Sequence, residues 1–592
     1  MAKSTYKDFK GTLPIKSPYR LPENYAQVAQ NCVFDRGSID GLKDNTLEGA
    51  VLKATPARIF KCGAKWESWT SFVSVVRSWI FDSTSDRFYY TDGTKPKQMR
   101  ESGIVDCTGG AGASTVYDLG IAAPAGTPTI AITYDGAPGA AIQATVAYVF
   151  TYVTSWGEES APSPASVVTD IYDDGYVTLT CPTPTAERAA ATLITKINIY
   201  RVASGTAGSD YQYLGEETIA AVTEDHIDRD GSNYAITPVI ELGEVIQTRD
   251  YDPPPAALIN LTSFANTMMA GSVSNKLYLT EPQIPYAFPA EYIKYVESDI
   301  VAIGNIGSSL CVATNTHPYI FTGTDPETMV PNKLNDGEKC VAQRGLVSTP
   351  YGVLYPSPNG LILAIHEGAR NITRDIFTEE QWGDLSPSGF ISFWYEEKYI
   401  AFTSGTNSGI AICGLFSDTP YVTTLRLGEY PAGYGIAIQD AYVDPGSRVM
   451  YLLVLSEDAS YYILLFNQSP EGIEYSWTSR KENFPNPVRF GAGMVLGQAG
   501  ADEFLITEDS EYLHTEASEY LIAAASGSGV ASLKVFADGV KRADRMVPVD
   551  GTPWRLPSGY TARDWEFVFE NVSARIDQVM VASTMDELKP WD

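Results

Sequence analysis

The sequence predicts an all-β protein in which a β-propeller is combined with an inserted sandwich and a terminal β-sandwich region. Strand-like apolar pairs recur along the chain, and their starts lie roughly 36 to 50 residues apart, which is the spacing of four-stranded propeller blades. The composition agrees, because hydrophobic residues make up 44% of the chain and charged residues only 19%, with 36 Tyr, 49 Gly and 36 Pro. Tyr suits half-buried pleated faces, whereas Gly and Pro supply turns.

The length of 592 residues is too great for one ordinary core, so we expect several domains. The predicted organisation is an N-terminal platform segment at 1–57, a first propeller unit with its linker at 58–122, an inserted module at 123–241, the main β-propeller at 253–515 and a C-terminal β-sandwich, also part of the platform, at 516–592. A set of ordinary antiparallel sandwiches with chance spacing is the alternative to the propeller.

The first part of the chain, residues 11–44, is expected to combine a short helix with short strands. Residues 21–29 are predicted to form the helix, which Pro22 can begin because the first helical turn needs no amide donor there. Residues 35–41 have the composition of a turn between strands. The next unit, 59–90, has the two-strand pattern of the later units but stands apart from them. We therefore predict that an insertion separates the first propeller unit from the rest.

The insertion, residues 123–241, begins with Ala123-Pro124 and then alternates apolar and polar residues, notably at 144–154. Further strands are predicted at 197–202 and 211–215. The whole segment resembles a fibronectin type III-like sandwich of about 100 residues. Modules of this type usually serve as spacers or contact surfaces. Its Pro-rich connections predict that it can be removed without unfolding the propeller.

The main propeller is expected to follow the rigid linker Asp252-Pro253-Pro254-Pro255, whose prolines fix φ and lack amide donors. Its clearest turn is Ser357-Pro358-Asn359-Gly360, in which Pro presets one dihedral angle and Asn-Gly supplies a positive φ. A propeller must hide the edges of its first and last blades, so we predict that 59–90 lies in the same ring as the later strands. The strand pairs are predicted at 264–279, 300–321, 346–365, 390–412, 438–466 and 488–504.

The final segment, from about residue 516, contains predicted strands at 531–536, 566–569 and 579–582. The N-terminal and C-terminal segments flank the propeller in the sequence. We predict that they pack together as one platform.

The opening of the chain and several later stretches carry a shared set of turn and strand-end motifs. The opening has Leu21-Pro22, then Ala-x-x-Ala-x-Asn at 26–31, a strand, Asp-x-Gly at 35–37, and Gly41-Leu42. The later stretches are Tyr251-Asp252-Pro253-Pro254-Pro255-Ala256, Met269-Ala270-Gly271-Ser272, 276–289, 319–329, 355–361, 477–481 and 553–565. In these motifs the chain resembles the nozzle proteins (tail tubular protein B) of short-tailed bacteriophages, the podoviruses.

The resemblance implies a structural virion protein at the distal end of a short tail. It implies a homo-oligomer, expected to be a hexameric ring, that lies below the adaptor or gatekeeper ring and helps to dock tail fibres or tailspikes. The central channel would carry DNA and ejection proteins during genome ejection through the host cell envelope, and DNA would pass transiently without specific binding. The expected location is the virion tail, with assembly in the cytoplasm of the bacterial host.

The charge balance fits the passage of DNA without adhesion. The chain has 72 acidic and 42 basic residues and a formal net charge of -30. Affinity for a phosphate backbone or an anionic membrane surface needs a concentration of Lys and Arg that this sequence lacks. We expect loops facing the channel axis to be rich in carboxylates, with Asp173-Asp174-Gly175 and Glu158-Glu159 as candidates. The alternative for both pairs is a solvated turn of the inserted module.

No motif predicts a catalytic, cofactor or metal site, so the chain is expected not to be an enzyme. The four His, at 226, 317, 366 and 514, share no metal-ligand spacing, and Asp225, Asp228 and Asp230 lack the EF-hand order. The seven Cys contain no Cys-x-x-Cys pair and are predicted to be buried free thiols from a reducing compartment. The N-terminus lacks an apolar signal core, and no apolar run reaches the ~20 residues that span a bilayer.

A carbohydrate-binding or carbohydrate-degrading β-propeller of a virion is the alternative function. It requires carboxylates and exposed aromatic rings on one face, and the 36 Tyr and 10 Trp leave this possibility open. A ring of several protomers with an axial hole favours the nozzle, whereas a monomer that cleaves polysaccharide favours the enzyme.

Overall fold

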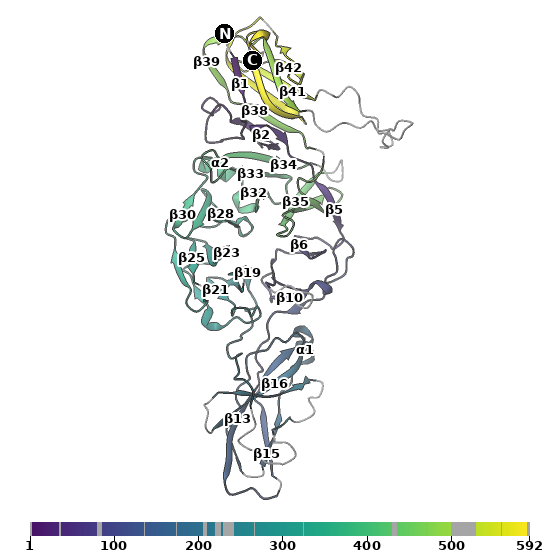
Figure 1. The fold of residues 1–592 in the computed structure, drawn as a ribbon, viewed down its shortest axis with the longest axis vertical. Helices are drawn as coiled ribbons and strands as arrows, with labels where there is room; N and C mark the ends of the chain where they lie inside the picture. The colour runs from purple at the N-terminus through teal and green to yellow at the C-terminus, as the bar shows by residue number, and fades with distance from the viewer. Residues whose placement is uncertain are drawn as a thin grey trace, which may run out of the picture.

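The all-β class predicted from the sequence is confirmed, since the molecule is built from short strands with two short α-helices among the described residues. Figure 1 shows an elongated molecule with three bodies in line, which we call the platform (residues 3–41 and 475–588), the ring (46–121 and 252–466) and the inserted module (123–250). The computed structural model describes residues 3–34, 37–79, 86–134, 136–172, 175–204, 210–219, 226–228, 242–265, 267–323, 325–428, 435–470, 472–498, 529–557, 559–572 and 574–588.

Within the described residues the ring contains five four-stranded antiparallel sheets, the two-stranded sheet β6–β7, and the four antiparallel strands β31–β34, which belong to a ten-stranded sheet that continues into the platform. The N-terminal part supplies β5 (Thr46–Val51), β6 (Arg58–Cys62), β7 (Lys65–Trp69), β8 (Ser74–Arg77), β9 (Arg87–Thr91), β10 (Lys97–Arg100) and β11 (Tyr117–Asp118). The later part supplies β19 (Ile259–Phe264), β20 (Met268–Val273), β21 (Lys276–Leu279), β22 (Lys294–Tyr295), β23 (Ile300–Ile306), β24 (Ser309–Thr314), β25 (Tyr319–Thr322), β26 (Val330–Lys333), β27 (Val347–Thr349), β28 (Gly352–Ser357), β29 (Gly360–Ile365), β30 (Gly368–Asn371), α2 (Glu379–Asp384), β31 (Phe390–Tyr395), β32 (Lys398–Thr403), β33 (Ser408–Cys413), β34 (Tyr421–Arg426), β35 (Ile436–Val443), β36 (Met450–Ser456) and β37 (Tyr461–Leu465).

Each sheet of the ring shares a hydrophobic core with the next, and the series of cores closes on itself. Burial of one large apolar side chain contributes about 1.5–3 kcal/mol, so these seven cores supply most of the cohesion of the ring. The pairs that share a core are β19–β22 with β23–β26, β23–β26 with β27–β30, β27–β30 with β31–β34, β31–β34 with β35–β37, β35–β37 and β5 with β6–β7, β6–β7 with β8–β11, and β8–β11 with β19–β20.

The ring is closed by strand exchange between distant parts of the chain. β5 pairs antiparallel with β37, so that Ala50 lies opposite Tyr462 and Val51 opposite Tyr461. The sheet that contains β35 and β36 is therefore completed by residues almost 400 positions earlier. The N-terminal strands β6 to β11 lie between this sheet and β19–β22, in the same body as the strands that follow residue 258.

The hairpin at 357–360 forms as its residues predict. Ser357 of β28 pairs with Gly360 of β29, which leaves Pro358-Asn359 as the connecting loop. Gly360 has φ of +156°, and a Cβ atom there would lie 2.3 Å from Nδ2 of Asn371. Glycine is favoured at this position because L side chains rarely adopt this φ and because a Cβ atom would force the Asn371 side chain to move.

The platform is made from both ends of the chain, which lie together at one extremity of the molecule (Figure 1). One sheet has the order β1–β45–β40–β43, and a second contains β2–β38–β44–β41–β42, with β39 also beside β44. Both sheets contribute to one core that includes Trp477, Trp565 and Val579. The strands are β1 (Lys3–Tyr6), β2 (Ala26–Gln30), β3 (Cys32–Val33), β4 (Asp40–Gly41), β38 (Tyr475–Ser479), β39 (Glu482–Val488), β40 (Ala492–Gln498), β41 (Val530–Ala537), β42 (Val540–Pro548), β43 (Trp554–Arg555), β44 (Ala562–Val572) and β45 (Arg575–Ala582).

The predicted helix at 21–29 is wrong. Residues 26–30 form β2 instead, which pairs with β38 so that Ala29 lies opposite Trp477. Ala26 and Ala29 are both buried in the platform core. Tertiary pairing here overrides a weak local helix preference.

Three boundaries differ from the predicted organisation. β5, expected in the platform segment 1–57, belongs to the ring, and β38 to β40, expected in the propeller at 253–515, belong to the platform. The inserted module continues beyond 241, because the backbone at 243–246 hydrogen-bonds to Tyr211 and Tyr213. Alternating strand patterns reveal strands but not their partners, and these assignments depend on partners.

The inserted module has two sheets around one core that includes Tyr148, Phe150 and Ile199. The sheet orders are β12–β15–β18 and β14–β13–β16–β17. Its two connections to the ring lie side by side, since a Cβ atom at Gly120 would lie 2.6 Å from Cδ of Pro254. The elements are β12 (Thr129–Tyr134), β13 (Ile142–Thr154), β14 (Thr169–Tyr172), β15 (Gly175–Thr180), α1 (Ala186–Thr192), β16 (Ile194–Ser204), β17 (Gln212–Thr218) and β18 (His226–Asp228).

Candidate functional site

The described part of the chain contains no group of three or more His, Cys, Asp or Glu side chains placed to hold a metal ion. His317 places Nδ1 2.9 Å from the carbonyl oxygen of Gly337. His514, Asp225 and Asp230 lie outside the described residues. All seven cysteines are free and buried, as predicted, and burial raises the pKa of Cys107 to about 11. None of the described helices has the length and apolar character needed to cross a membrane.

A buried charge cluster ties three parts of the ring together. The carboxylate of Asp440 in β35 is fully buried and accepts hydrogen bonds from Nη1 of Arg58 at 3.0 and 3.2 Å. It also accepts from the amide of Ile59 at 3.0 Å and from Nη2 of Arg344, which precedes β27. Both guanidinium groups lie 5.3 Å from the ring of Phe72. The cluster joins β35 to β6. Through Arg344 it also reaches the turn that precedes β27.

The platform meets the ring at Asn31, which follows β2. Its side-chain Oδ1 accepts from the amide of Arg426 at 2.7 Å, and its Nδ2 donates to the carbonyl of Arg426 at 2.9 Å. Beside this pair, β2 and β34 form a short parallel pairing in which Gln30 lies opposite Thr424. This pairing joins the platform strands to the ring strands. Asn31 adopts φ of +54°, a conformation that Asn tolerates better than most residues. This Asn is the last residue of the Ala-x-x-Ala-x-Asn motif.

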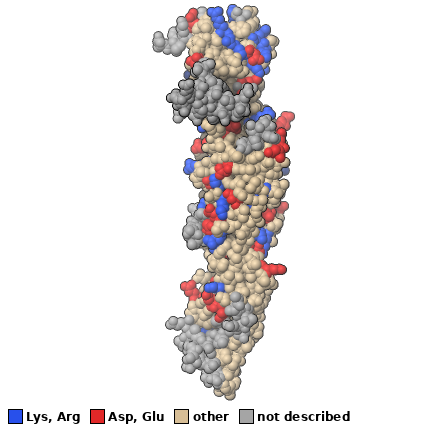
Figure 2. Space-filling model, turned by 90° about the vertical axis from the view of Figure 1, so that its right-hand side faces the viewer, with Lys and Arg blue, Asp and Glu red and all other residues tan. Residues whose placement is uncertain are grey.

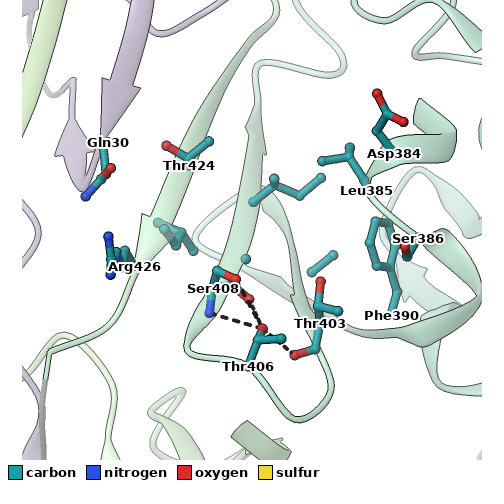
Figure 3. Close-up of a pocket in the computed structure, with 14 residues that line it drawn as sticks. Gln30, Asp384, Leu385, Ser386, Phe390, Thr403, Thr406, Ser408, Thr424 and Arg426 are labelled. Atoms are coloured by element: carbon teal, nitrogen blue, oxygen red, sulfur yellow. Dashed lines mark hydrogen bonds between the residues drawn. The ribbon is translucent and has the colours of Figure 1, made fainter. Parts of the chain in front are cut away.

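A surface pocket of about 430 Å³ lies at this joint, between β2, β33, β34 and the end of α2. Figure 3 shows Gln30 and Arg426 on one side of the pocket and Asp384, Ser386 and Phe390 on the other. The hydroxyl of Thr406 donates to the carbonyl of Thr403 at 2.8 Å and accepts from the amide of Ser408 at 3.3 Å. The lining lacks a nucleophile paired with a base, so its chemistry is suited to polar contact rather than to covalent catalysis.

Of the two carboxylate pairs expected to face a channel, the structure describes Glu158 and Glu159. Glu158 is buried and pairs with Arg87 of the ring at 2.7 Å, with a second hydrogen bond from Gln98 at 3.0 Å. Burial raises the pKa of Glu158, against the opposing effect of Arg87 and Gln98. Asp173 and Asp174 lie outside the described residues. The assignment of Glu158 to a channel surface is wrong, because it anchors the inserted module to the ring.

Glu159, the neighbouring carboxylate, lies at the same junction and faces a cleft. Its Oε1 accepts from the hydroxyl of Tyr200 at 2.6 Å and from the hydroxyl of Thr151. Tyr213, Tyr251 and Tyr286 line the same cleft. Sequence reasoning missed this group, since its members come from separate strands and connections of the module and the ring and no local motif marks them.

Comparisons with known proteins leave the family of this chain open. No family model matches the sequence, and no curated protein matches it. The solved structures that it is similar to include the N-terminal domain of Nup159, with 8% identity, a TM-score of 0.21, and coverage of 63% of this chain and 86% of that one. They also include PorZ, a surface component of the type-IX secretion system of Porphyromonas gingivalis, with 7% identity, a TM-score of 0.21, and coverage of 70% and 45%. These scores identify no family to which the chain belongs.

Proposed function

We propose that this chain is a structural virion protein, the nozzle at the distal end of a short phage tail, and that its ring is a β-propeller. The observation that carries the proposal is the construction of the molecule: both chain ends form one body at one extremity, and the ring behind it is a closed series of small sheets. Two of the motifs of the resemblance fall on the connections between these bodies. Ala26 to Asn31 lies where the platform meets the ring, and Tyr251 to Pro255 lies where the ring meets the inserted module.

In this proposal the platforms of several subunits, expected to be six, join into a ring around a channel. The channel carries DNA and ejection proteins from the adaptor ring above, and the exposed outer surfaces dock tail fibres or tailspikes. The net charge of -30 favours a wall that does not retain DNA phosphates. The same charge opposes assembly, because identical acidic subunits repel one another.

One strip of the platform is suited to overcome that repulsion. β42 ends its sheet and carries three exposed basic side chains, Lys541, Arg542 and Arg545, and one exposed acidic side chain, Asp544, which pairs with Lys541 at 2.8 Å. Val540 and Met546 on the same strand are 50% and 55% exposed. Figure 2 shows Lys and Arg side chains gathered on the platform, whereas acidic and basic side chains alternate along the ring. We assign this basic edge, residues 540–548, to contact with a second copy of the chain, whose overall surface is acidic.

Charge reversal tests the assignment and the assembly together. We expect the unmodified protein to form rings with an axial hole in negative-stain electron microscopy, with a matching mass by light scattering. The variant with Lys541→Glu, Arg542→Glu and Arg545→Glu is expected to remain monomeric. The control variant carries the same charge change on exposed residues of the ring, at Lys339, Arg370 and Arg374, and is expected to form rings.

The outcomes distinguish the contact through β42 from the nozzle role. Rings from the unmodified protein and from both variants reject the β42 contact but keep the nozzle. A monomer in every sample that also degrades polysaccharide rejects the nozzle and supports the carbohydrate-active alternative.

A further inference from the structure

A cleft of about 540 Å³ lies where the inserted module meets the ring. Residues 243–248 form one wall, held by hydrogen bonds from the amide of Tyr213 to the carbonyl of Glu244 and from the amide of Gly243 to the carbonyl of Tyr213, at 2.9 and 2.8 Å. Tyr286, from the ring, forms part of the opposite side. The cleft is therefore assembled only when the module is docked on the ring.

Aromatic rings dominate the lining. Tyr200 and Tyr213 lie edge to face with centroids 5.9 Å apart, and Tyr251 and Tyr286 do the same at 6.0 Å. Tyr213, Tyr251 and Tyr286 are half-buried, so parts of their rings remain open to the cleft. Half-buried tyrosines offer an apolar face and a polar hydroxyl to the same ligand.

A fixed carboxylate lies among these rings. Glu159 receives hydrogen bonds from Tyr200 and Thr151 on Oε1, and its own amide lies 3.4 Å from the hydroxyl of Tyr286. A carboxylate has about four acceptor positions, so Glu159 retains capacity for hydroxyl groups of a ligand. The hydrogen bonds on Oε1 hold the side chain in place before any ligand arrives.

Thr248 is a second, independent observation that points to a polar ligand in the cleft. It lines the cleft and is 7% exposed, and its Oγ1 has no hydrogen-bond partner among the described residues. A buried hydroxyl without a partner is destabilising, because the hydrogen bonds that it made to water are not replaced. Less than 1 Å² of Oγ1 is exposed, so a ligand hydroxyl would satisfy it only after the Thr248 side chain turned Oγ1 towards the cleft.

The charges of the lining restrict the ligand class. The lining contains Glu159 and Glu244 but neither Lys nor Arg. Phosphate groups, uronic acids and sialic acids would meet unbalanced negative charge. Gln247 adds an amide that can both donate and accept a hydrogen bond.

We propose that this cleft binds a neutral saccharide, with the tyrosine rings against the C–H face of a sugar and with Glu159, Gln247 and Thr248 hydrogen-bonded to its hydroxyls. Concave shape, aromatic walls and a few convergent polar groups are the ordinary components of a small-molecule site. The saccharide site goes beyond the nozzle role and does not depend on it.

Saturation-transfer NMR on the full chain tests the proposal with glucose, galactose, mannose, rhamnose and N-acetylglucosamine as probes. Glucuronic acid is the anionic comparison and choline the cationic one. We expect at least one neutral sugar to bind with a Kd of about 1 mM or tighter. Binding should weaken at least tenfold in Tyr213→Ala and in Thr248→Val, while Thr248→Ser, which keeps the hydroxyl, should bind as the unmodified chain does.

Two controls show whether a loss of sugar binding is specific to the cleft. Tyr295→Ala removes a tyrosine that is 59% exposed elsewhere on the ring, and it should leave binding unchanged. Thermal melting of each variant shows whether the fold is retained. Binding of none of the five neutral sugars, or of choline alone, overturns the proposal, and so does neutral-sugar binding that is equal in Thr248→Val and Thr248→Ser. None of these results bears on ring assembly by electron microscopy.

Discussion

The carboxylate of Asp440 has no exposed surface, yet it holds two arginines, one from β6 and one from the turn that precedes β27. Removal of one member of a buried ion pair leaves the other charge without compensation. Asp440 is therefore the side chain whose loss should weaken the ring most for a single substitution, although it lies in an ordinary strand pattern and carries no sequence motif.

Asp440→Ala is predicted to lower the free energy of unfolding by about 3–5 kcal/mol, because Arg58 and Arg344 lose their common partner inside the ring. Urea unfolding followed by tryptophan fluorescence measures the loss. Asp418→Ala, at an exposed turn between β33 and β34, is the matched control and should change stability by less than about 0.5 kcal/mol. Equal effects of the two substitutions would contradict the role assigned to Asp440.

Asp118 gives a prediction for pH dependence. Burial by itself would raise its pKa, but hydrogen bonds from Lys95 and Lys97 outweigh burial and hold the pKa below the ordinary value. A carboxyl with a lowered folded-state pKa stabilises the fold above its unfolded pKa of about 3.9, and this stabilisation disappears as the pH falls through the folded value. The contribution of Asp118 is therefore complete at neutral pH and is lost in acid below about pH 4.

The unmodified chain is thus predicted to exceed Asp118→Asn in stability by about 1 kcal/mol at pH 7, since the two lysines are partly exposed and screened. The difference should shrink towards zero below about pH 4. Urea unfolding of both proteins from pH 3 to pH 7 provides the comparison. A difference that stays constant through the acid range would show that the lysines do not act on the carboxylate.

Strand β5 is the element on which closure of the ring depends. Leu47 is 44% exposed, so much of this strand is held by its backbone pairing with β37 rather than by burial. A proline inside a paired strand removes an amide donor and fixes φ. Closure is therefore sensitive to backbone substitutions that leave the cores of the other sheets untouched.

Ala50→Pro is predicted to destabilise the ring by roughly 3 kcal/mol and to increase hydrogen exchange in β37. Exchange in β28 and β29, in a distant sheet, should change much less. Ala54→Pro, in the exposed loop that follows β5, is the control and should leave exchange in β37 as it was. If both prolines acted equally on β37, the closing role of β5 would have to be abandoned.

Sequence patterns predicted some elements well because their cause is local. The hairpin at 357–360 depends on four consecutive residues, and the strand pairs of the ring depend on neighbouring runs. The helix expected at 21–29 failed because Ala26 and Ala29 are buried against strands more than 440 residues away. The tyrosine cleft could not be predicted for the same reason, since Glu159, Tyr213 and Tyr286 meet only after the module docks.

At the scale of the whole molecule, the inserted module is attached but not interwoven. Its two connections lie beside each other at Gly120 and Pro254, and its core takes Ile121 from the end of the ring segment but is otherwise built from the module. The junction is nevertheless specific, because Glu158 pairs with Arg87, and the guanidinium of Arg87 lies 4.7 Å from the ring of Trp156. Removal of the module should therefore leave a folded ring that has lost some stability near β9.

Replacement of residues 122–251 by a short Gly-Ser linker is predicted to give a soluble protein that still melts cooperatively. Circular dichroism and differential scanning calorimetry check the outcome. Arg87→Ala in the shortened protein should have little effect, whereas in the full chain it should cost about 3 kcal/mol, because the buried carboxylate of Glu158 loses its partner. Aggregation of the shortened protein without a cooperative transition would place the module inside the folding unit of the ring.

The pairing of β5 with β37 also limits which parts of the ring can fold while the chain is still being synthesised. β5 emerges early in synthesis, yet its partner β37 is more than 400 residues further along the chain. β1 can pair only after its partner β45, near the C-terminal end, has been synthesised. The inserted module is the one body whose described strands are contiguous in sequence, so it can fold on the nascent chain while β1 and β5 still lack their partners. Because its two connections lie side by side at Gly120 and Pro254, a module that folds during translation would hold the end of β11 close to the start of β19 before the later sheets of the ring exist.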